Sequence, residues 1–184
     1  GMSYADNYKT LFVNIEEPLF EDGPRADTVE NNALIRILKF DVAEKKCIAQ
    51  YAYKLDKIAY APNPETAFKI NGVSDILSLG NNKLLVMERS ASKGRIPATI
   101  KLFIADLNGA TDISFTTLKN NRSFIAAKKS LLLNMDDLGI YTDNLEGITF
   151  GPLLPNGHKT LLFVADNNFS NTEKAQLLLF EVLE

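Results

Sequence analysis

The most constraining feature of this sequence is an internal repeat. A short apolar run that contains valine recurs three times, and each time a polar loop and a second, longer apolar run follow it. The three copies begin with Leu11-Phe12-Val13, Leu84-Leu85-Val86 and Leu162-Phe163-Val164. With the valines as anchors, the spacings are 86 − 13 = 73 and 164 − 86 = 78 residues. A unit of several strands that repeats in this way is typical of β-propeller blades.

The apolar runs inside the repeat are short and rich in Val, Ile and Phe, which favours strands over helices. The breaks between them carry turn dipeptides such as Asp22-Gly23 and Asn108-Gly109. One stretch leaves two alternatives, because Arg122 to Leu138 fits an amphipathic helix and Ser130 to Asn134 fits a buried strand. The repeat favours the strand. We therefore predict a single all-β domain over residues 1–184, a partial β-propeller of about three four-stranded blades.

The copies differ in how complete they are. Copy two supplies a whole blade, counted from the centre outward, at Ser74–Leu79, Lys83–Arg89, Thr99–Leu107 and Lys129–Asp136. Copy one is predicted to lack the innermost strand, and copy three the outermost. Open ends of this kind tend to pair with another chain, so we expect a homodimer that completes the propeller. The alternative is half of a native monomer, with its edges covered by its own loops, such as Pro62 to Lys69.

Composition excludes several functional classes. The net charge is −3 with a pI of about 5.3, so nothing favours binding to nucleic acid or to an anionic membrane surface. No apolar run approaches the roughly 18 residues that span a bilayer. The single cysteine, Cys47, excludes an internal disulfide and a cysteine-rich zinc site. The single histidine, His158, lies in a predicted turn, which argues against a Ser-His-Asp triad.

Acidic side chains stand at the ends of the predicted inner strands. They are Glu16, Asp75, Glu88, Glu146 and Asp166, and Asn167 adds an amide oxygen beside the last of them. Such oxygens, converging on a central channel, suit calcium or another divalent cation, which could hold a phosphate or polarise a water. For each acid the alternative is an ion pair with a nearby Lys or Arg. Arg89 is predicted either to pair with a channel acid or to hold an oxyanion.

Three segments together resemble the esterase-like domain of the phytase family. They are Phe12 to Leu19 with Asp22-Gly23, then Val73 to Leu77 with Glu88-Arg89-Ser90, then Asn144-Leu145-Glu146-Gly147 with Asp166-Asn167-Asn168-Phe169-Ser170. The resemblance covers nearly the whole chain, although family members carry a further stretch ahead of it. It implies a propeller fold, export from the cytoplasm and phosphoester hydrolysis. The recurrent polar positions of the family fall on Glu16, Asp75, Glu88, Arg89, Glu146, Asp166 and Asn167.

Two functions are open at this point. The first is a phosphoester hydrolase that acts on a small phosphorylated or ester substrate. Its catalytic residues would be Glu88, Arg89 and Glu146, and its ligands for calcium or another divalent cation would be Glu16, Asp75, Asp166 and Asn167. The second is a non-catalytic binding or interaction propeller, which the lack of a histidine in the motifs favours. From the resemblance we expect a periplasmic or secreted protein, although Gly1 to Tyr4 shows no signal-peptide pattern.

Overall fold

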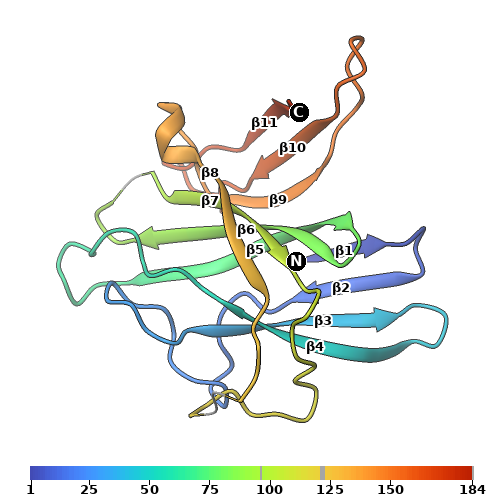
Figure 1. The fold of residues 1–184 in the computed structure, drawn as a ribbon. Coiled ribbons are helices and arrows are strands. Elements are labelled where there is room, and N and C mark those ends of the chain that lie inside the picture. Colours follow the sequence, from blue (N-terminus) through green and yellow to red (C-terminus); the bar gives the residue numbers. More distant parts are fainter. Residues whose placement is uncertain (96, 121–122, 184) are drawn as a thin grey trace.

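The computed structural model describes residues 1–95, 97–120 and 123–183 of the chain. Within these ranges it contains eleven strands, one short 3-10 helix and three antiparallel sheets, which confirms the predicted all-β fold (Figure 1). Each sheet is a meander, because strands that follow one another in the chain pair side by side. No helix in the described part of the chain is long and apolar enough to cross a bilayer.

We call the sheets blades 1, 2 and 3 in chain order. Blade 1 contains β1 (Met2–Ala5), β2 (Thr10–Asn14), β3 (Leu34–Asp41) and β4 (Lys46–Lys54). Blade 2 contains β5 (Lys69–Gly80), β6 (Lys83–Ser92), β7 (Thr99–Asp106) and β8 (Lys128–Asn134), and the 3-10 helix η1 (Met135–Leu138) follows it. Blade 3 contains β9 (Leu145–Phe150), β10 (Thr160–Ala165) and β11 (Gln176–Glu181).

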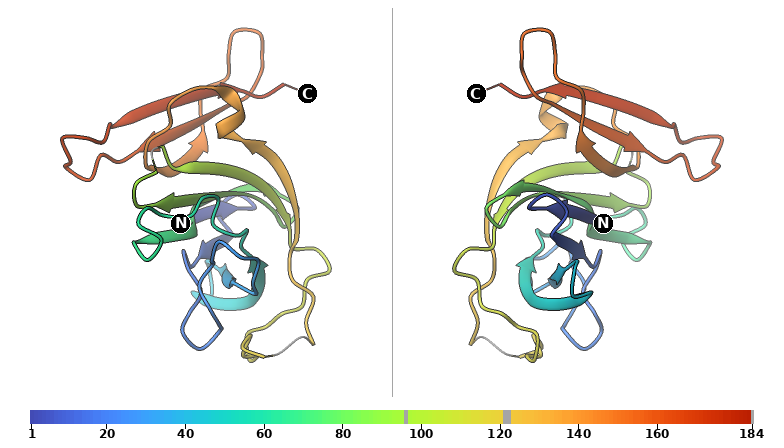
Figure 2. Two further views of the ribbon diagram at one scale, coloured as in Figure 1. Left: turned by 90° about the vertical axis from the view of Figure 1, so that its left-hand side faces the viewer. Right: turned by 90° about the vertical axis from the view of Figure 1, so that its right-hand side faces the viewer.

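The three blades are stacked as successive layers, with their innermost strands side by side (Figure 2). The backbone N–H of Ser78 in β5 donates to Ser3 Oγ in β1 at 2.8 Å. The backbone N–H of Ile148 in β9 donates to Asp75 Oδ2 in β5 at 3.0 Å. The arrangement is therefore propeller-like, and the described blades do not close a ring.

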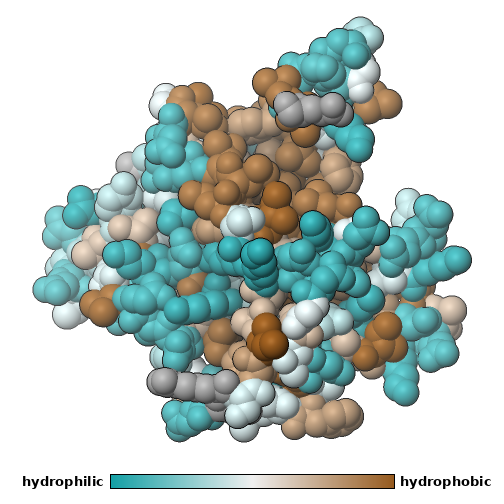
Figure 3. Space-filling model, viewed as in Figure 1, coloured by the Kyte–Doolittle hydropathy of each residue, from teal (hydrophilic) through white to brown (hydrophobic). Residues whose placement is uncertain are grey.

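One predicted gap in the strands is wrong and the other is confirmed. Blade 1 has an innermost strand, because β1 pairs with β2 from Met2 opposite Val13 to Ala5 opposite Thr10. Four residues that include Ser3 carry too weak an apolar pattern to be recognised in the sequence. Among the described residues, blade 3 lacks a fourth strand, as predicted. No strand in the described part of the chain pairs with the outer edge of β11. Figure 3 shows an apolar surface in the upper middle of the view, below blade 3. Leu131 and Leu132 of β8 are each 55% exposed.

The alternatives for the stretch before η1 are resolved in favour of the strand. Ser130 to Asn134 belongs to β8, which pairs with β7. The helix alternative is wrong, since only Met135–Leu138 is helical there; Arg122, at its predicted start, lies outside the described residues. Asn134 caps the short helix by accepting from Asp136 N, and Gly139 ends it at a φ of 65°, a left-handed conformation that glycine adopts without strain.

Most of the core lies in two apolar interfaces, one on each face of blade 2. A smaller cluster joins blade 1 to the loop after β7 through Leu34, Ala52, Ile113 and Leu118. The interface with blade 1 contains Phe12, Ile35, Ile37, Tyr53, Ile76, Leu84, Val86 and Phe103. The interface with blade 3 contains Leu77, Leu85, Met87, Leu102, Leu145, Ile148 and Phe163. Because blade 2 is buried on both faces, β6 is a continuous apolar run rather than an alternating one, as expected for a strand inside a layered fold.

In the structure, the third copy of the repeat aligns with the second copy one residue earlier than the valine anchors predict. Val86 packs in the interface with blade 1, and Phe163 packs in the interface with blade 2, whereas Val164 lies on the opposite face and is 46% exposed. Successive side chains of a strand point to opposite faces, so a slip of one residue exchanges the faces. The valine anchor is therefore wrong for copy three, and the structural spacings are 86 − 13 = 73 and 163 − 86 = 77. In this register Glu16, Arg89 and Asp166 occupy equivalent positions.

A buried ion pair fixes two long loops to blade 1. Arg36 of β3 donates from Nε to Asp22 Oδ2 at 2.6 Å and from Nη2 to Asp22 Oδ1 at 2.7 Å. The same guanidinium donates to the carbonyl oxygens of Ile113 and Thr116 at 3.1 and 2.7 Å. The side chain of Asp22 is only 2% exposed, and its hydrogen bond raises the pKa of Arg36. This pair joins the loop before β3 to the loop after β7.

We predict that Asp22→Ala lowers the free energy of unfolding by about 3–5 kcal/mol, because it leaves the Arg36 guanidinium buried without its counter-ion. Urea denaturation followed by circular dichroism measures the change. Glu30→Ala is the matched control, since the Glu30 and Lys54 side chains are 60% and 45% exposed. An exposed pair of this kind contributes less than about 1 kcal/mol. Equal losses in the two variants would contradict the assignment.

Candidate functional site

Arg89 joins all three blades. It lies in β6, and its Nη2 is 3.3 Å from Glu16 Oε1 and 3.1 Å from Glu146 Oε1. Glu16 follows β2 of blade 1, and Glu146 lies in β9 of blade 3. The Arg89 side chain is 15% exposed, while those of Glu16 and Glu146 are 50% and 38% exposed. The Nε of Arg89 is buried and has no hydrogen-bond partner. Both ion pairs are thus made by Nη2, with two carboxylates that solvent can reach.

Local backbone features bring these three side chains together. The pairing of β9 with β10 shifts between Val164 and Ala165, so that Glu146 is the extra residue of a β-bulge. A bulge re-aims the side chain of its extra residue, and here it turns Glu146 toward Arg89. Gly72 lies opposite Arg89 in β5. A Cβ on Gly72 would come within 2.9 Å of Glu16 Cγ, so glycine is needed for Glu16 to pass over β5.

Asp75 lies on the inner side of the blades, apart from Arg89. Its Oδ1 accepts from the N–H of Ile76 at 2.9 Å, and its Oδ2 accepts from the N–H of Ile148 at 3.0 Å. The carboxylate therefore links β5 to β9. Asn14 ends β2 nearby, donates from Nδ2 to the carbonyl of Val73 at 2.9 Å, and has a buried Oδ1 without a partner. A Cβ on Gly1 would meet both Asp75 Oδ1 and Asn14 Oδ1, which places these two oxygens close together.

Glu88 faces the opposite direction from Arg89, because neighbouring residues of a strand alternate between its faces. Its side chain is 1% exposed and lies between blades 1 and 2. Its Oε1 accepts from the Tyr53 hydroxyl at 2.7 Å and pairs with the ammonium of Lys129. Its Oε2 accepts from Asn71 Nδ2 at 2.8 Å and from the N–H of Asp56 at 3.0 Å. The carboxylate is thus saturated by protein donors and separated from Glu16 and Glu146.

The network around Glu88 shifts the pKa of two neighbours. Burial, followed by the charge of Glu88, raises the pKa of Tyr53 well above its usual value, so the phenol stays protonated. Burial raises the pKa of Asp56, but hydrogen bonds from Lys129 and Lys101 outweigh it, and the net pKa is lowered. Lys129 also lies 3.8 Å from the centre of the Phe103 ring, a cation–π contact. This network therefore holds blades 1 and 2 together with charges that are fully paired.

Asp166 and Asn167 form a turn after β10. Asp166 Oδ1 accepts from the N–H of Asn168 at 3.1 Å, and Asn167 Oδ1 accepts from the N–H of Phe169 at 3.2 Å. Their side chains stabilise this loop, and neither residue lines the pocket beside Arg89. His158 pairs with Glu181 at 2.6 Å across a hairpin of blade 3 and does not line that pocket either.

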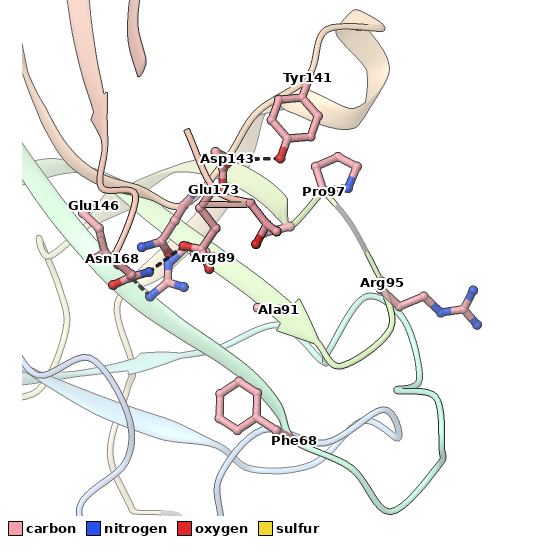
Figure 4. Close-up of a pocket in the computed structure, with 13 residues that line it drawn as sticks. Phe68, Arg89, Ala91, Arg95, Pro97, Tyr141, Asp143, Glu146, Asn168 and Glu173 are labelled. Carbon is pink, nitrogen blue, oxygen red and sulfur yellow. Dashed lines mark hydrogen bonds and ion pairs between the residues drawn. The ribbon is translucent and has the colours of Figure 1, made fainter. Parts of the chain in front are cut away.

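The pocket beside Arg89 has a volume of about 410 Å³ and lies between blades 2 and 3. Figure 4 shows Arg89, Glu146 and Asn168 together on one side, with Tyr141 and Asp143 at one end and Phe68 at the other. Sequence reasoning identified Arg89 and Glu146 here and noted Asn168. It missed other lining residues, chiefly Phe68, Arg95, Tyr141, Asp143 and Glu173. Asp143 directly precedes the Asn144-Leu145-Glu146-Gly147 motif, and that position could have signalled it.

Hydrogen bonds organise the end of the pocket near Tyr141. The Tyr141 hydroxyl donates to Asp143 Oδ2 at 2.8 Å, and this bond raises the pKa of Tyr141. Asp143 is 7% exposed and also accepts from the N–H groups of Asn144 and Lys174. Across the pocket, Asn168 donates to Glu173 Oε2 at 2.7 Å. The lining therefore combines one semi-buried guanidinium with several hydrogen-bonding groups in fixed positions.

The carboxylates do not form a cation cage. In the described ranges, no three His, Cys, Asp or Glu side chains lie close enough to hold a metal ion together. Glu16 and Glu146 converge, but the guanidinium of Arg89 lies between them, and Asp75 already accepts two backbone N–H groups. The predicted ligand set of Glu16, Asp75, Asp166 and Asn167 is therefore distributed over separate places in the fold.

Comparison with known proteins identifies a family. The family model named Phytase-like, and described as esterase-like activity of phytase, matches residues 1–169. The matched segment includes β1 to β10 and ends in the turn that follows β10. No curated protein and no solved structure matches the chain.

The two glutamates give a prediction about stability. Glu88→Gln should lower the free energy of unfolding by about 1–3 kcal/mol, because buried donors at Asn71 and Asp56 would face an amide instead of a carboxylate. Glu146→Gln should cost less than about 1 kcal/mol, because the Glu146 carboxylate is 38% exposed and Arg89 keeps its ion pair with Glu16. Urea denaturation of both variants compares them directly. A loss at Glu146 as large as that at Glu88 would show that the two networks have been assigned the wrong way round.

Proposed function

Because the chain belongs to the Phytase-like family, we propose that it hydrolyses small anionic esters, phosphoesters in particular, in the pocket beside Arg89. The observation that carries this proposal is the state of the Arg89 side chain. It is 15% exposed, its Nε has no hydrogen-bond partner, and its two partners are carboxylates that are 50% and 38% exposed. A guanidinium with free donors in a pocket suits a phosphate, which it can bind through two parallel hydrogen bonds.

Arg89 is assigned to substrate binding in this proposal. A phosphate oxygen takes the place of the Glu146 carboxylate at the guanidinium, and Glu16 remains as the counter-ion. Asn168 and Tyr141 line the same pocket and offer hydrogen-bonding groups to the rest of the substrate. Since the pKa of Tyr141 is raised by its bond to Asp143, its hydroxyl stays protonated up to alkaline pH.

Glu146 is assigned to general base catalysis. Once released from Arg89, its carboxylate accepts a proton from a water molecule while the water oxygen attacks phosphorus. The bond from phosphorus to the alcohol oxygen breaks, and solvent returns a proton to that oxygen. The bulge that aims Glu146 at Arg89 also keeps it beside the bound phosphate. Glu88 is left out of the reaction, because four protein donors occupy its carboxylate.

Calcium binding stays a prediction that the mechanism does not use. Glu16, Asp75, Asp166 and Asn167 are bound to other groups and do not converge. A bound cation would supply charge to stabilise the phosphate. The strongest support for a bound cation is Asn14 Oδ1. This oxygen is buried, has no hydrogen-bond partner and lies close to Asp75.

A non-catalytic binding propeller is the second candidate, and a specific observation favours it. The carboxylates that line the pocket are held by protein donors, since Glu146 pairs with Arg89, Asp143 with Tyr141, and Glu173 with Asn168. A pocket of this kind binds an anion without providing a free base. Export to the periplasm or the medium is compatible with both candidates and remains an expectation.

The proposal predicts turnover of p-nitrophenyl phosphate or myo-inositol hexakisphosphate, measured as released product. Glu146→Gln should lower kcat/KM by roughly 10²–10⁴-fold, the usual contribution of a general base. Arg89→Gln should raise KM and weaken the binding of inorganic phosphate in calorimetry. Arg25→Gln is the matched control, because Arg25 pairs with Glu17 and is 72% exposed. Undiminished turnover in both pocket variants would place catalysis elsewhere.

Two further results separate the alternatives. Phosphate binding that depends on Arg89, with no turnover of either ester, would replace the hydrolase by the binding propeller. Titration with calcium tests whether the protein binds the cation, and turnover in the presence of a chelator tests whether the reaction needs it. We expect calcium binding to weaken in Asp75→Asn, and an absence of binding to the parent protein would remove the cation from the hypothesis.

A further inference from the structure

The two outer faces of the stack carry the same apolar positions that form its internal interfaces. We call the face of blade 1 that points away from blade 2, and the corresponding face of blade 3, the two end faces. The structural repeat relates each end face to one face of blade 2, because Val13, Val86 and Phe163 are equivalent. This makes it meaningful to compare the exposure of equivalent residues in the three blades.

The end face of blade 3 matches the face of blade 2 that packs on blade 3. Val164 and Leu177 lie opposite each other in β10 and β11, as Met87 and Leu102 do in β6 and β7. Met87 and Leu102 are 0% and 2% exposed, whereas Val164 and Leu177 are 46% and 71% exposed. Leu179, on the same end face, is 54% exposed. These exposed apolar side chains are therefore suited to packing against another blade.

The end face of blade 1 matches the face of blade 2 that packs on blade 1. Met2 lies opposite Val13, as Ile76 lies opposite Val86. Ile76 is fully buried, whereas Met2 is 66% exposed and Tyr4, two residues along the same strand, is 51% exposed. The loop after β7 covers the outer part of this face through Ile113 and Leu118, and the part near β1 stays open.

We propose that two copies of the chain close one ring of six blades, with the end face of blade 3 in each copy packed on the end face of blade 1 in the other. The new interfaces continue the two that exist inside each chain. Closed propellers have roughly four to eight blades, and with three blades per chain only two copies fall in that range. The assembly has two-fold symmetry, as most homo-oligomers do. In this ring the open edge of β11 stays at the periphery.

The ring predicts a particle of 2 × 20.4 = 40.8 kDa by light scattering behind a sizing column. Leu177→Asp on one end face and Tyr4→Asp on the other should each convert it to the monomer, because each of the two interfaces uses both faces. Tyr60→Asp is the control, since Tyr60 is 55% exposed in the loop between β4 and β5, where its carbonyl accepts a hydrogen bond from Ser92 of blade 2. Circular dichroism confirms that the variants remain folded, as the changed side chains are exposed.

Three results would overturn the proposal. The first is a parent protein that stays monomeric up to about 100 µM, a concentration that fills any interface with a low micromolar Kd. The second is a dimer that Leu177→Asp disrupts and Tyr4→Asp does not, which would mean that two blade 3 faces pair with each other. The third is a series of larger oligomers, which would mean that the contact does not close.

Discussion

The packing of blade 2 between its two neighbours is the interaction on which the rest of the structure depends. Residues Leu84 to Glu88 of β6 are buried without interruption, with the even positions facing blade 1 and the odd positions facing blade 3. A sheet that buries both faces cannot exist alone in water, so blades 1 and 3 are required for blade 2 to fold. The order of the blades, and with it the position of every polar group between them, follows from this requirement.

Two neighbouring residues show how the same alternation separates structural from functional polar groups. Glu88 points between blades 1 and 2, where burial demands that each of its oxygens meet a donor, and Tyr53, Asn71 and Lys129 supply them. Arg89 points to the other side, where β6 has passed the end of the apolar interface and solvent enters. Because solvent reaches the Arg89 guanidinium there, the protein does not have to occupy all of its N–H donors. Some of these donors remain available to a ligand.

Much of the fold could be predicted from the sequence, because apolar runs of strand length repeat with turn residues between them. β1 was missed since its four residues carry little pattern, and the third copy was misaligned by one residue because valine identity hid the equivalence of Phe163 with Val86. The separation of Glu88 from Arg89 was predictable from strand alternation alone. The meeting of Arg89 with Glu16 and Glu146 was not, because it depends on a bulge at Glu146 and on the missing side chain at Gly72. Tyr141 and Asp143 line the pocket because of the shape of the loop that holds them. The spacing of apolar residues in the sequence does not predict that shape.

The open edge of β11 has a consequence for local opening. Backbone amides of β6 bond into ladders with both β5 and β7, whereas β11 pairs with β10 alone. Separating β11 breaks one ladder and exposes Leu178 and Phe180, while separating β6 breaks two ladders and both apolar interfaces. Amide hydrogen exchange should therefore be faster in β11 than in β6.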